Sequence, residues 1–409
     1  MELKPILSAM RRNKVGAILI AVQMAITLAI LCNGLFIIEQ RVALSKRPTG
    51  ADENNTFVIL NQWVGNPPDL AAKWQADLAA LRALPGVVDA TATNTYPMSD
   101  GGSTDGIKLD PDQQNETALA ARYFVDEHGM QAFGLKLIGG RNFNADEVVE
   151  LHGYTDSKPA AGVIVTRALA EKLFPGKSPL GRVIYSMADR HAMPIVGVVD
   201  RLQVPWVGAN NWGSKFNDYS MLMPYRYVSQ FYVYIVRAQP GQLATLMQAA
   251  PKTLFHVNRA RVLEKTISLK DARVEAYRND RGLAVILGVV CATLLAVTAF
   301  GIVGLTSYWV AQRRRQIGIR RALGATRRAI VRYFQTENLL IAVAGAAIGI
   351  ALAMSLNLWM VTAFEMERLQ AGYAFIGAAV VLLLGQAAVL WPALKAGSVP
   401  PALATRGGA

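Results

Sequence analysis

The segment Gln312–Thr336 carries the side chains best suited to binding chemistry, because it contains eight arginines and no acidic residue. Guanidinium groups bind carboxylates and phosphates, and near an anionic membrane each cation contributes about 1 kcal/mol. A lipid anchor needs only charge, whereas here apolar side chains alternate with arginines and a turn follows. The residues concerned are Ile317, Gly318, Ile319, Arg320, Arg321, Ala322, Leu323, Gly324, Ala325 and Thr326.

The end of this segment has the residues that stop one helix and start another. Gly324 is suited to end a helix, and Thr326 is suited to cap the next one. We therefore predict a short amphipathic helix, a sharp turn and a new helix. We expect its apolar face to dock in a groove of a partner protein, and a purely lipid-anchoring role is the alternative.

A second motif, Gly176-Lys177-Ser178, resembles the end of a phosphate-binding loop. Such a loop needs a further glycine five positions before Gly176, and this chain has Glu171 there. We therefore predict turns rather than a nucleotide site. The histidines are scattered and show neither metal-ligand spacing nor a catalytic arrangement, so we expect no metal site, no bound cofactor and no enzyme activity. They are His128, His152, His191 and His256.

Four apolar segments are long enough to cross a membrane and must position the arginine segment. They are Val15–Ile38, Leu283–Val310, Leu339–Phe364 and Tyr373–Leu394. The first exceeds the apolar core of a signal peptide and lacks a nearby cleavage site, so we interpret it as an uncleaved anchor.

The net charge of +13 is confined to the flanks of these apolar segments. Nucleic-acid binding is therefore not expected, because a nucleic-acid domain spreads its cations over a folded face. Cationic flanks stay in the cytoplasm. This rule places residues 1–14, 311–338 and 395–409 inside the cell, and residues 39–282 and 365–372 outside.

The outside region of about 244 residues is large enough for two subdomains. Its patterns predict a mixed α/β fold: a strand at Thr56–Asn61, a helix at Pro68–Leu84 opening at Asp69, and a strand at Tyr232–Ala238 that pairs back with the first. Leu269–Asp280 is a polar helical run that leads into the second span as a stalk. The fold class is thus a four-helix membrane protein with a large two-subdomain α/β insertion after the first helix.

The spans contain no charge at mid-membrane depth, which argues against an ion or sugar pathway through them. Glu337 lies at the cytoplasmic edge of the third span, and we expect it to pair with an arginine of the loop; a moving gate residue is the alternative. Gly345 and Gly349 allow a second helix to approach closely.

Four segments carry a family resemblance. Arg313–Leu340, RRRQIGIRRALGATRRAIVRYFQTENLL, resembles the signature loop of MacB/FtsX-type ABC transporter permeases. The stretches LRALPGVV (Leu81–Val88) and YFVDEHGMQAFGLKLIGGRNF (Tyr123–Phe143) are similar to the extracytoplasmic domain of that family. Trp391–Arg406 is similar to its C-terminal tail, although this chain ends TRGGA without the usual acidic residue.

The resemblance implies a permease of the mechanotransmission type (type VII) in a bacterial inner membrane. Its expected partners are two copies of an ABC ATPase that binds the ATP, a second identical or homologous permease, membrane lipids, and a periplasmic adaptor with an outer-membrane channel. Gly318–Thr326 would be the docking segment and Glu337 the glutamate of the motif. Only about 14 residues precede the first span, so we expect the ATPase to be a separate chain.

Three functions remain open from the sequence. The leading one is export of a peptide, antibiotic or other amphiphile from the periplasm or outer leaflet. The second is lipoprotein release, and the third is FtsX-like regulation of a cell-wall hydrolase without transport. The large outside region favours export and lipoprotein release, because FtsX-like regulators usually have a much smaller outside domain.

Overall fold

The computed structural model describes residues 14–65, 67–152, 156–188, 190–208, 216–364 and 367–398. The chain divides into two compact units: Ala43–Asp280 forms one, and the residues before and after it form the other. The predicted cytoplasmic N-terminus (residues 1–14, except Lys14) and the end of the tail (399–409) lie outside the described residues, as do residues 365 and 366 of the predicted external turn.

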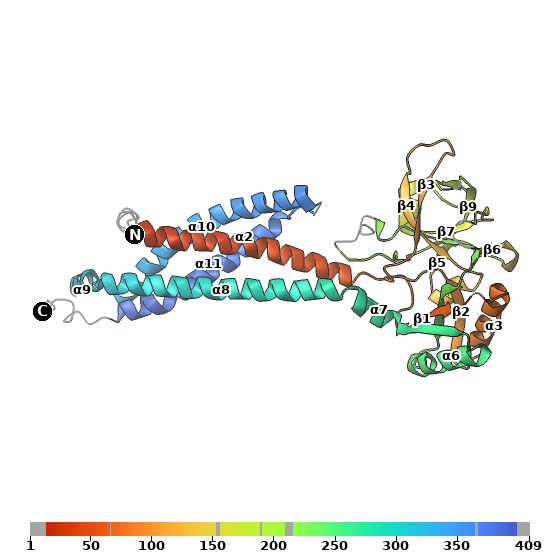
Figure 1. The fold of residues 1–409 in the computed structure, drawn as a ribbon. Helices are drawn as coiled ribbons and strands as arrows, with labels where there is room; N and C mark the ends of the chain where they lie inside the picture. The colour runs from red at the N-terminus through yellow and green to blue at the C-terminus, as the bar shows by residue number, and fades with distance from the viewer. Residues whose placement is uncertain are drawn as a thin grey trace. The chain divides into compact units, whose positions relative to one another are not determined.

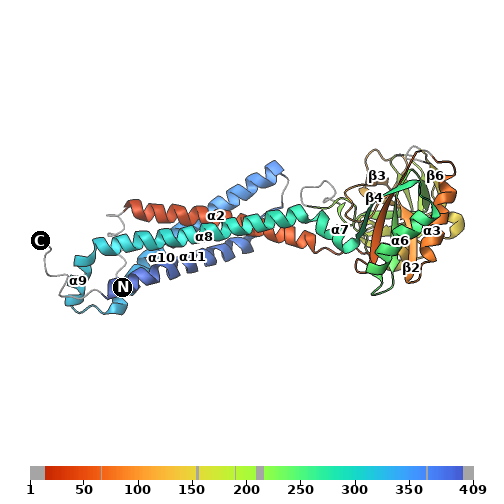
Figure 2. The same cartoon turned by 60° about the horizontal axis from the view of Figure 1, so that its bottom comes forward.

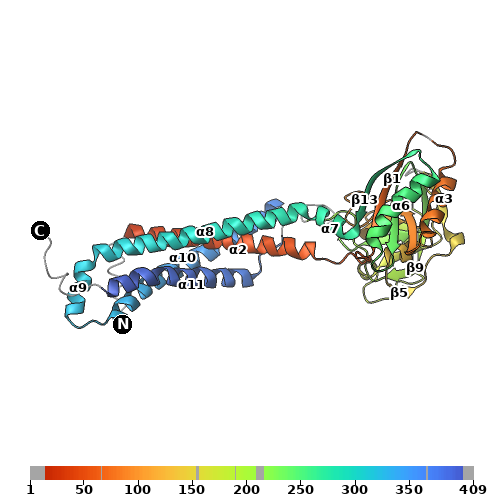
Figure 3. The same cartoon turned by 90° about the horizontal axis from the view of Figure 1, so that it is seen from below.

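Long helices build the first unit (Figure 1). They are α2 (Lys14–Ser45), α8 (Arg278–Gln312), α10 (Arg327–Phe364) and α11 (Ala371–Gly397), and the short helix α9 (Arg314–Ala322) lies between α8 and α10. Among the described residues, these four long helices have the length and composition to cross a membrane. Each contains one of the apolar segments predicted as a span, and the three views show them running beside one another (Figures 2 and 3).

Helix α2 is packed closely against α10 at two glycines. A Cβ atom added to Gly345 would lie 2.8 Å from the carbonyl oxygen of Ala21, and one added to Gly349 would lie 2.9 Å from that of Ala25. These distances are shorter than van der Waals contact, so a side chain at either glycine would force the helices apart. Gly345 and Gly349 are therefore contact residues between α2 and α10.

A four-stranded sheet with two helices forms one subdomain of the second unit. Its strand order is β13-β1-β12-β2, and α3 and α6 pack on it. Strand β1 pairs antiparallel with β12, as the sequence predicts. The bounds are β1 Thr56–Trp63, α3 Leu70–Arg82, β2 Val87–Thr93, β12 Phe231–Ala238, α6 Leu243–Val257 and β13 Arg261–Ser268.

A closed barrel forms the other subdomain. Its ring of strands is β9-β7-β10-β4-β3-β8, which returns to β9, and β5 pairs with β9 beside the ring. A separate two-stranded sheet joins β6 and β11. The bounds are β3 Ser103–Lys108, β4 Ala118–Phe124, α4 Gly129–Phe133, β5 Leu137–Gly140, η1 Ala145–Glu147, β6 Val149–His152, β7 Val163–Thr166, α5 Arg167–Leu173, β8 Val183–Ser186, β9 Ala192–Val199, β10 Ser220–Met223 and β11 Tyr225–Val228.

The motif Gly176-Lys177-Ser178 lies in the connection between α5 and β8. Gly176 has a positive φ of 65°, which glycine adopts without a Cβ penalty, and its amide donates to Glu171 Oε1 at 3.2 Å. The residue that replaces the missing glycine of a phosphate loop thus helps to hold an ordinary turn.

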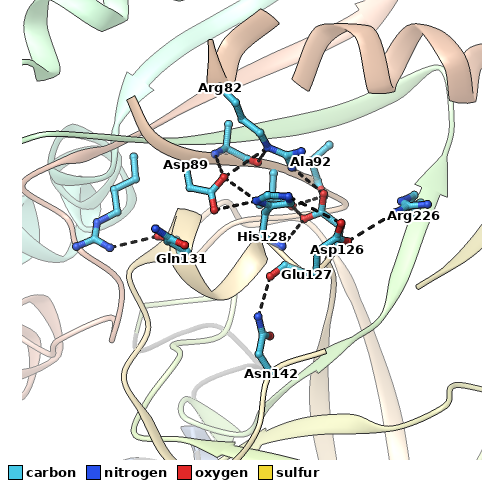
Figure 4. A network of polar contacts seen from close by, with 12 residues as sticks. Arg82, Asp89, Ala92, Asp126, Glu127, His128, Gln131, Asn142 and Arg226 are labelled. Atoms are coloured by element: carbon cyan, nitrogen blue, oxygen red, sulfur yellow. Dashed lines mark hydrogen bonds and ion pairs between the residues drawn. The ribbon is translucent and has the colours of Figure 1, made fainter. Parts of the chain in front are cut away.

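A polar network joins the two subdomains (Figure 4). Arg82, at the end of α3, donates to Asp126 at 2.8 Å and lies 3.4 Å from Asp89 of β2. His128 Nδ1 lies 2.9 Å from Asp89, and the Thr91 hydroxyl donates to Asp126 at 2.6 Å. The segment that follows β4 of the barrel is therefore tied to α3 and β2 of the four-stranded subdomain.

An ion pair joins the two segments through which the chain enters and leaves the second unit. Arg273 of helix α7 (Leu269–Ala276) donates twice to Glu53, at 2.7 and 2.6 Å, and once to the carbonyl oxygen of Ser45 at the end of α2, at 2.9 Å. Burial alone would raise the pKa of Glu53, but hydrogen bonds from Arg273 and Thr49 outweigh it and lower that pKa. The end of α2 and the helix before α8 are thus held together.

The predicted stalk Leu269–Asp280 is not one continuous run. Helix α7 ends at Ala276, and α8 begins at Arg278 after a break at Tyr277. The Tyr277 side chain is buried, and its hydroxyl accepts a hydrogen bond from Gln203 at 2.8 Å. The sequence carries no glycine or proline there, so the break arises from this tertiary contact.

Candidate coupling site

The arginine segment forms the helix, turn and helix that its residues predict. Helix α9 ends at Ala322, and Gly324 follows with a φ of +97°. The Gly324 amide donates to the carbonyl of Arg321 at 3.1 Å, and the Ala325 amide donates to that of Arg320 at 3.0 Å. This pair of bonds is a Schellman motif, which satisfies the last carbonyls of a helix and needs a left-handed residue such as glycine.

Thr326 begins the next helix. Its hydroxyl accepts a hydrogen bond from the amide of Ala329 at 3.2 Å, and α10 starts at Arg327. An N-cap of this kind satisfies one of the unpaired amides at a helix start and typically stabilises it by about 1 kcal/mol. The turn between α9 and α10 is therefore fixed by its own residues on both sides.

The apolar residues of the segment do not share one outward face. Ile317 is 5% exposed and belongs to the helix-bundle core, and Gly318 is also buried. Leu323 is 84% exposed and Ile319 is 46% exposed, and Ala322 is exposed beside them. Ile317 and Gly318 thus attach α9 to its own bundle, and Ala325 also packs against the bundle core. Ile319, Ala322 and Leu323 remain exposed to another molecule.

A buried ion pair fixes the start of α9 to α10. Arg313 donates from Nη1 to both carboxylate oxygens of Glu337, at 3.0 and 2.8 Å, and the Glu337 side chain is 3% exposed. Glu337 is therefore paired with a loop arginine, as expected from the sequence. A buried charge left without its partner is costly, so the pair holds the end of α8 against α10.

Arg320 makes a contact that the sequence does not indicate. Its guanidinium lies 5.0 Å from the centre of the Tyr333 ring on α10, within the range of a cation–π interaction. The two residues are on different helices, so their contact cannot be predicted from the spacing of residues along one helix. The sequence shows only that α9 contains a basic residue and that the first two turns of α10 contain an aromatic one. The turn between the helices is what brings these two residues together.

The site as a whole is a cationic platform on a rigid base. The Schellman turn, the Thr326 cap and the Arg313–Glu337 pair hold the backbone, while Leu323 and several arginines face outward. Side chains held in place lose little entropy when a partner binds. The arrangement suits docking of a protein surface with acidic groups around an apolar groove.

Two family models match this chain. The MacB-like periplasmic core domain matches residues 15–253, and the FtsX-like permease C-terminal region matches residues 288–401. The first alone covers more than half of the chain. The chain therefore belongs to the family of membrane permeases that combine a MacB-like periplasmic core domain with an FtsX-like permease region, within the class of ABC exporter permeases.

Curated relatives carry names of exporters. The chain is 26% identical to the macrolide export ATP-binding/permease protein MacB of Chromobacterium violaceum, over 55% of this chain and 33% of that protein. It is 27% identical to the pyoverdine export ATP-binding/permease protein PvdT of Pseudomonas putida, over 64% and 42%. It is 25% identical to MacB of Neisseria meningitidis serogroup A, over 75% and 45%. The chain thus spans between a third and a half of the length of these relatives.

Solved structures of extracytoplasmic domains also match. The periplasmic region of MacB from Actinobacillus actinomycetemcomitans matches with a TM-score of 0.33 and 14% identity, over 54% of this chain and 92% of that one. The extracellular domain of the transporter YknZ from Gram-positive bacteria matches with a TM-score of 0.32 and 15% identity, over 51% and 100%.

Proposed function

We propose that this chain is the permease subunit of an ABC exporter that is driven by a cytoplasmic ATPase docked on α9 and the turn after it. The N-terminus, the arginine segment and the C-terminus face the cytoplasm, and the unit Ala43–Asp280 lies outside. ATP-driven closure moves α8 and α10 at their cytoplasmic ends. Helices α2 and α8 carry this movement outward because each of them continues into the outer unit.

The observation that carries the proposal is the fixed, outward-facing arginine segment. Leu323 is exposed at a turn held by two backbone bonds and a threonine cap, and a buried ion pair ties the start of the segment to α10. An anchor for lipid headgroups has no need of a defined turn or a buried clamp. A surface that must transmit force needs both, since a flexible loop would absorb the movement.

The names of the relatives and the charges in the bundle bear on the kind of molecule that is transported. The names of two relatives state export of macrolides and of pyoverdine. Arg313 and Glu337 form a buried ion pair in the bundle, so their charges neutralise each other. We therefore propose that the substrate is an amphiphile taken from the outside and moved by the outer unit, with a second permease and a periplasmic adaptor as partners.

Charge reversal at the platform tests the docking. Arg320→Glu together with Arg321→Glu should abolish co-purification of the full chain with its ABC ATPase, because four units of charge change at the contact. The matched control is Arg278→Glu with Arg281→Glu, which makes the same change at two exposed arginines near the other end of α8. Unchanged co-purification of the Arg320/Arg321 variant would contradict the docking proposal. An equal loss of co-purification in the control variant would also contradict it.

A further inference from the structure

Side-chain hydrogen bonds join α2 and α8, the two helices through which the chain leaves and re-enters the bundle. The hydroxyl oxygens of Thr27 on α2 and Thr298 on α8 lie 2.7 Å apart, and both side chains are buried. The side-chain amide of Gln23 on α2 donates to the carbonyl oxygen of Val297 on α8 at 3.1 Å. Inside a membrane, a polar side chain that loses its partner finds no water to replace it. These bonds therefore favour one alignment of the two helices.

The shapes of the two helices favour the same alignment. A Cβ atom added to Gly301 of α8 would lie 2.6 Å from Gln23 Oε1, so the amide of Gln23 occupies the space that a side chain at position 301 would need. A Cβ atom added to Gly16 of α2 would lie 2.6 Å from Cζ2 of the Trp309 ring on α8. Each of these glycines thus receives a larger side chain from the facing helix, and the pairs interlock in both directions.

The contacts follow one continuous antiparallel register, which we call the α2–α8 seam. At its far end a Cβ atom added to Gly34 of α2 would lie 2.9 Å from Cys291 Sγ of α8. The α2 positions of the seam are 16, 23, 27 and 34, with the spacings of seven and four residues that are typical of a coiled-coil contact. The facing positions on α8 are 309, 301, 298 and 291, in the reverse order. The helices are therefore aligned over most of their apolar length.

Sliding one helix along the other would break these contacts together. A shift of one helical turn is about 5.4 Å, which would separate the Thr27 and Thr298 hydroxyls far beyond hydrogen-bonding distance. The same shift would bring Gln23 opposite Leu305 in one direction and opposite Val297 in the other, in place of Gly301. A branched side chain where the packing has room only for glycine is unfavourable. The seam therefore opposes axial movement of α2 against α8.

We propose that Gln23, Thr27 and Thr298 lock the register of α2 against α8, so that the two helices move as one body when the ATPase acts. The movement that they pass outward is then a tilt or rotation of the pair, and neither helix slides along the other. This inference rests on the proposed function and deepens it, because it specifies which movement couples the arginine segment to the unit Ala43–Asp280.

Paired cysteines in the full chain test the register. In a background with alanine at both native cysteine positions, Thr27→Cys is combined with Thr298→Cys, because side-chain atoms 2.7 Å apart can be replaced by a disulfide of about 2.05 Å. Two matched pairs carry the second cysteine one turn away, as Leu294→Cys or Ile302→Cys. The proteins are oxidised in nanodiscs with the ABC ATPase, in the absence of ATP and during its hydrolysis.

The pattern of cross-links distinguishes a locked register from a sliding one. We expect the Thr27→Cys/Thr298→Cys pair to cross-link under both conditions and the two displaced pairs to stay reduced under both. A cross-link in either displaced pair during ATP hydrolysis would show that α2 and α8 slide, and it would overturn the proposal. Failure of the Thr27→Cys/Thr298→Cys pair to cross-link would overturn it as well.

The activity of the cross-linked protein is the second readout. With the bond between positions 27 and 298 formed, permease-dependent ATP hydrolysis should fall by less than about twofold, because a constraint that fits both states shifts no equilibrium between them. A larger loss in a complex that stays intact overturns the proposal. An ATPase that does not bind even the reduced chain contradicts the docking proposal instead, and the cross-links of the chain alone still test the register.

Two glycines of α8 provide a matched comparison for the packing of the seam. Gly301→Leu places a side chain where the Gln23 amide lies, and it should lower the yield of the cross-link between positions 27 and 298 about fivefold or more. Gly304→Leu is the control, because a Cβ there meets nothing within 4 Å, and its yield should be unchanged. If Gly301→Leu does not fold, Gly301→Ala is compared with Gly304→Ala in the same way. Equal yields at the two positions overturn the proposal.

Discussion

Arg261 and Asp77 form a fully buried ion pair in the four-stranded subdomain. Their side chains are 0% exposed and share two bonds, of 2.8 and 2.7 Å. Tyr234 donates a further hydrogen bond to Asp77, and the Arg261 guanidinium lies 4.2 Å from the centre of the Trp63 ring. The pair ties α3 to β13, which are far apart in sequence.

Removing one partner should therefore destabilise this subdomain. Arg261→Met leaves Asp77 buried without its cation, and we expect a loss of about 3–5 kcal/mol in the free energy of opening of α3 and β1. Hydrogen exchange of the full chain measures it, because protection of buried amides reports local opening. Arg259→Met, at an exposed neighbour, is the control. Equal protection in the two variants would contradict the assigned role.

The pH dependence of this variant follows from the same burial. Burial raises the pKa of Asp77 above its ordinary value, although hydrogen bonds from Arg261 and Tyr234 oppose this. Without Arg261, one of the hydrogen bonds that lower the pKa of Asp77 is lost. The native state of the variant then binds a proton at Asp77 more tightly than the unfolded state does. Stability then rises as the pH falls toward the raised pKa. The deficit of Arg261→Met should thus shrink under acidic conditions.

The pairing of Arg261 with Asp77 is not visible in the sequence. A basic residue at the start of one strand and an acidic residue in a helix are ordinary surface residues in a linear reading. The same holds for Arg122 and Asp105, which lie on the consecutive strands β4 and β3 and meet only when these strands pair in register. Glu337 differs, because its position at the end of an apolar segment beside eight arginines already indicates a partner.

Among the elements, the helices follow from local signals, whereas the order of the strands does not. Gly324 and Thr326 specify the turn between α9 and α10 by their own chemistry, and the apolar segments specify the long helices. The barrel strands are short, and their spatial order β9-β7-β10-β4-β3-β8 is far from their sequence order. Pairing across such distances depends on tertiary packing, which one sequence without its fold does not reveal.

The contact of α2 with α10 gives a prediction at this scale. In Gly349→Leu the new side chain must displace the backbone of α2 near Ala25, and we expect about 1–3 kcal/mol of destabilisation. Gly304→Leu on α8 is the control, because a Cβ there meets nothing within 4 Å. Thermal unfolding of the full chain in detergent, followed by tryptophan fluorescence, compares them. An unfolding temperature of Gly349→Leu equal to that of Gly304→Leu would show that the contact contributes nothing.

At the scale of the whole molecule, two helices connect the units. The chain leaves the bundle through α2 and returns through α8, and Arg273 binds the end of α2 and Glu53 close to the start of α8. Under the proposed coupling, movement applied to α8 at the α9 platform would reach a point in the unit Ala43–Asp280 where both connections are held together. This arrangement supports a permease that works by transmitting movement.

Cross-linking from Leu323 tests the coupling platform most directly. The native cysteines, Cys32 and Cys291, are buried, so Leu323→Cys can be labelled selectively with a photoactivatable maleimide in membranes that contain the ABC ATPase. The same label at Val64→Cys, which is 58% exposed in the outer unit, is the control. We predict a cross-link to the ATPase from position 323 and none from position 64. Absence of an ATPase cross-link at position 323, in a complex that still forms, would contradict the proposed docking surface.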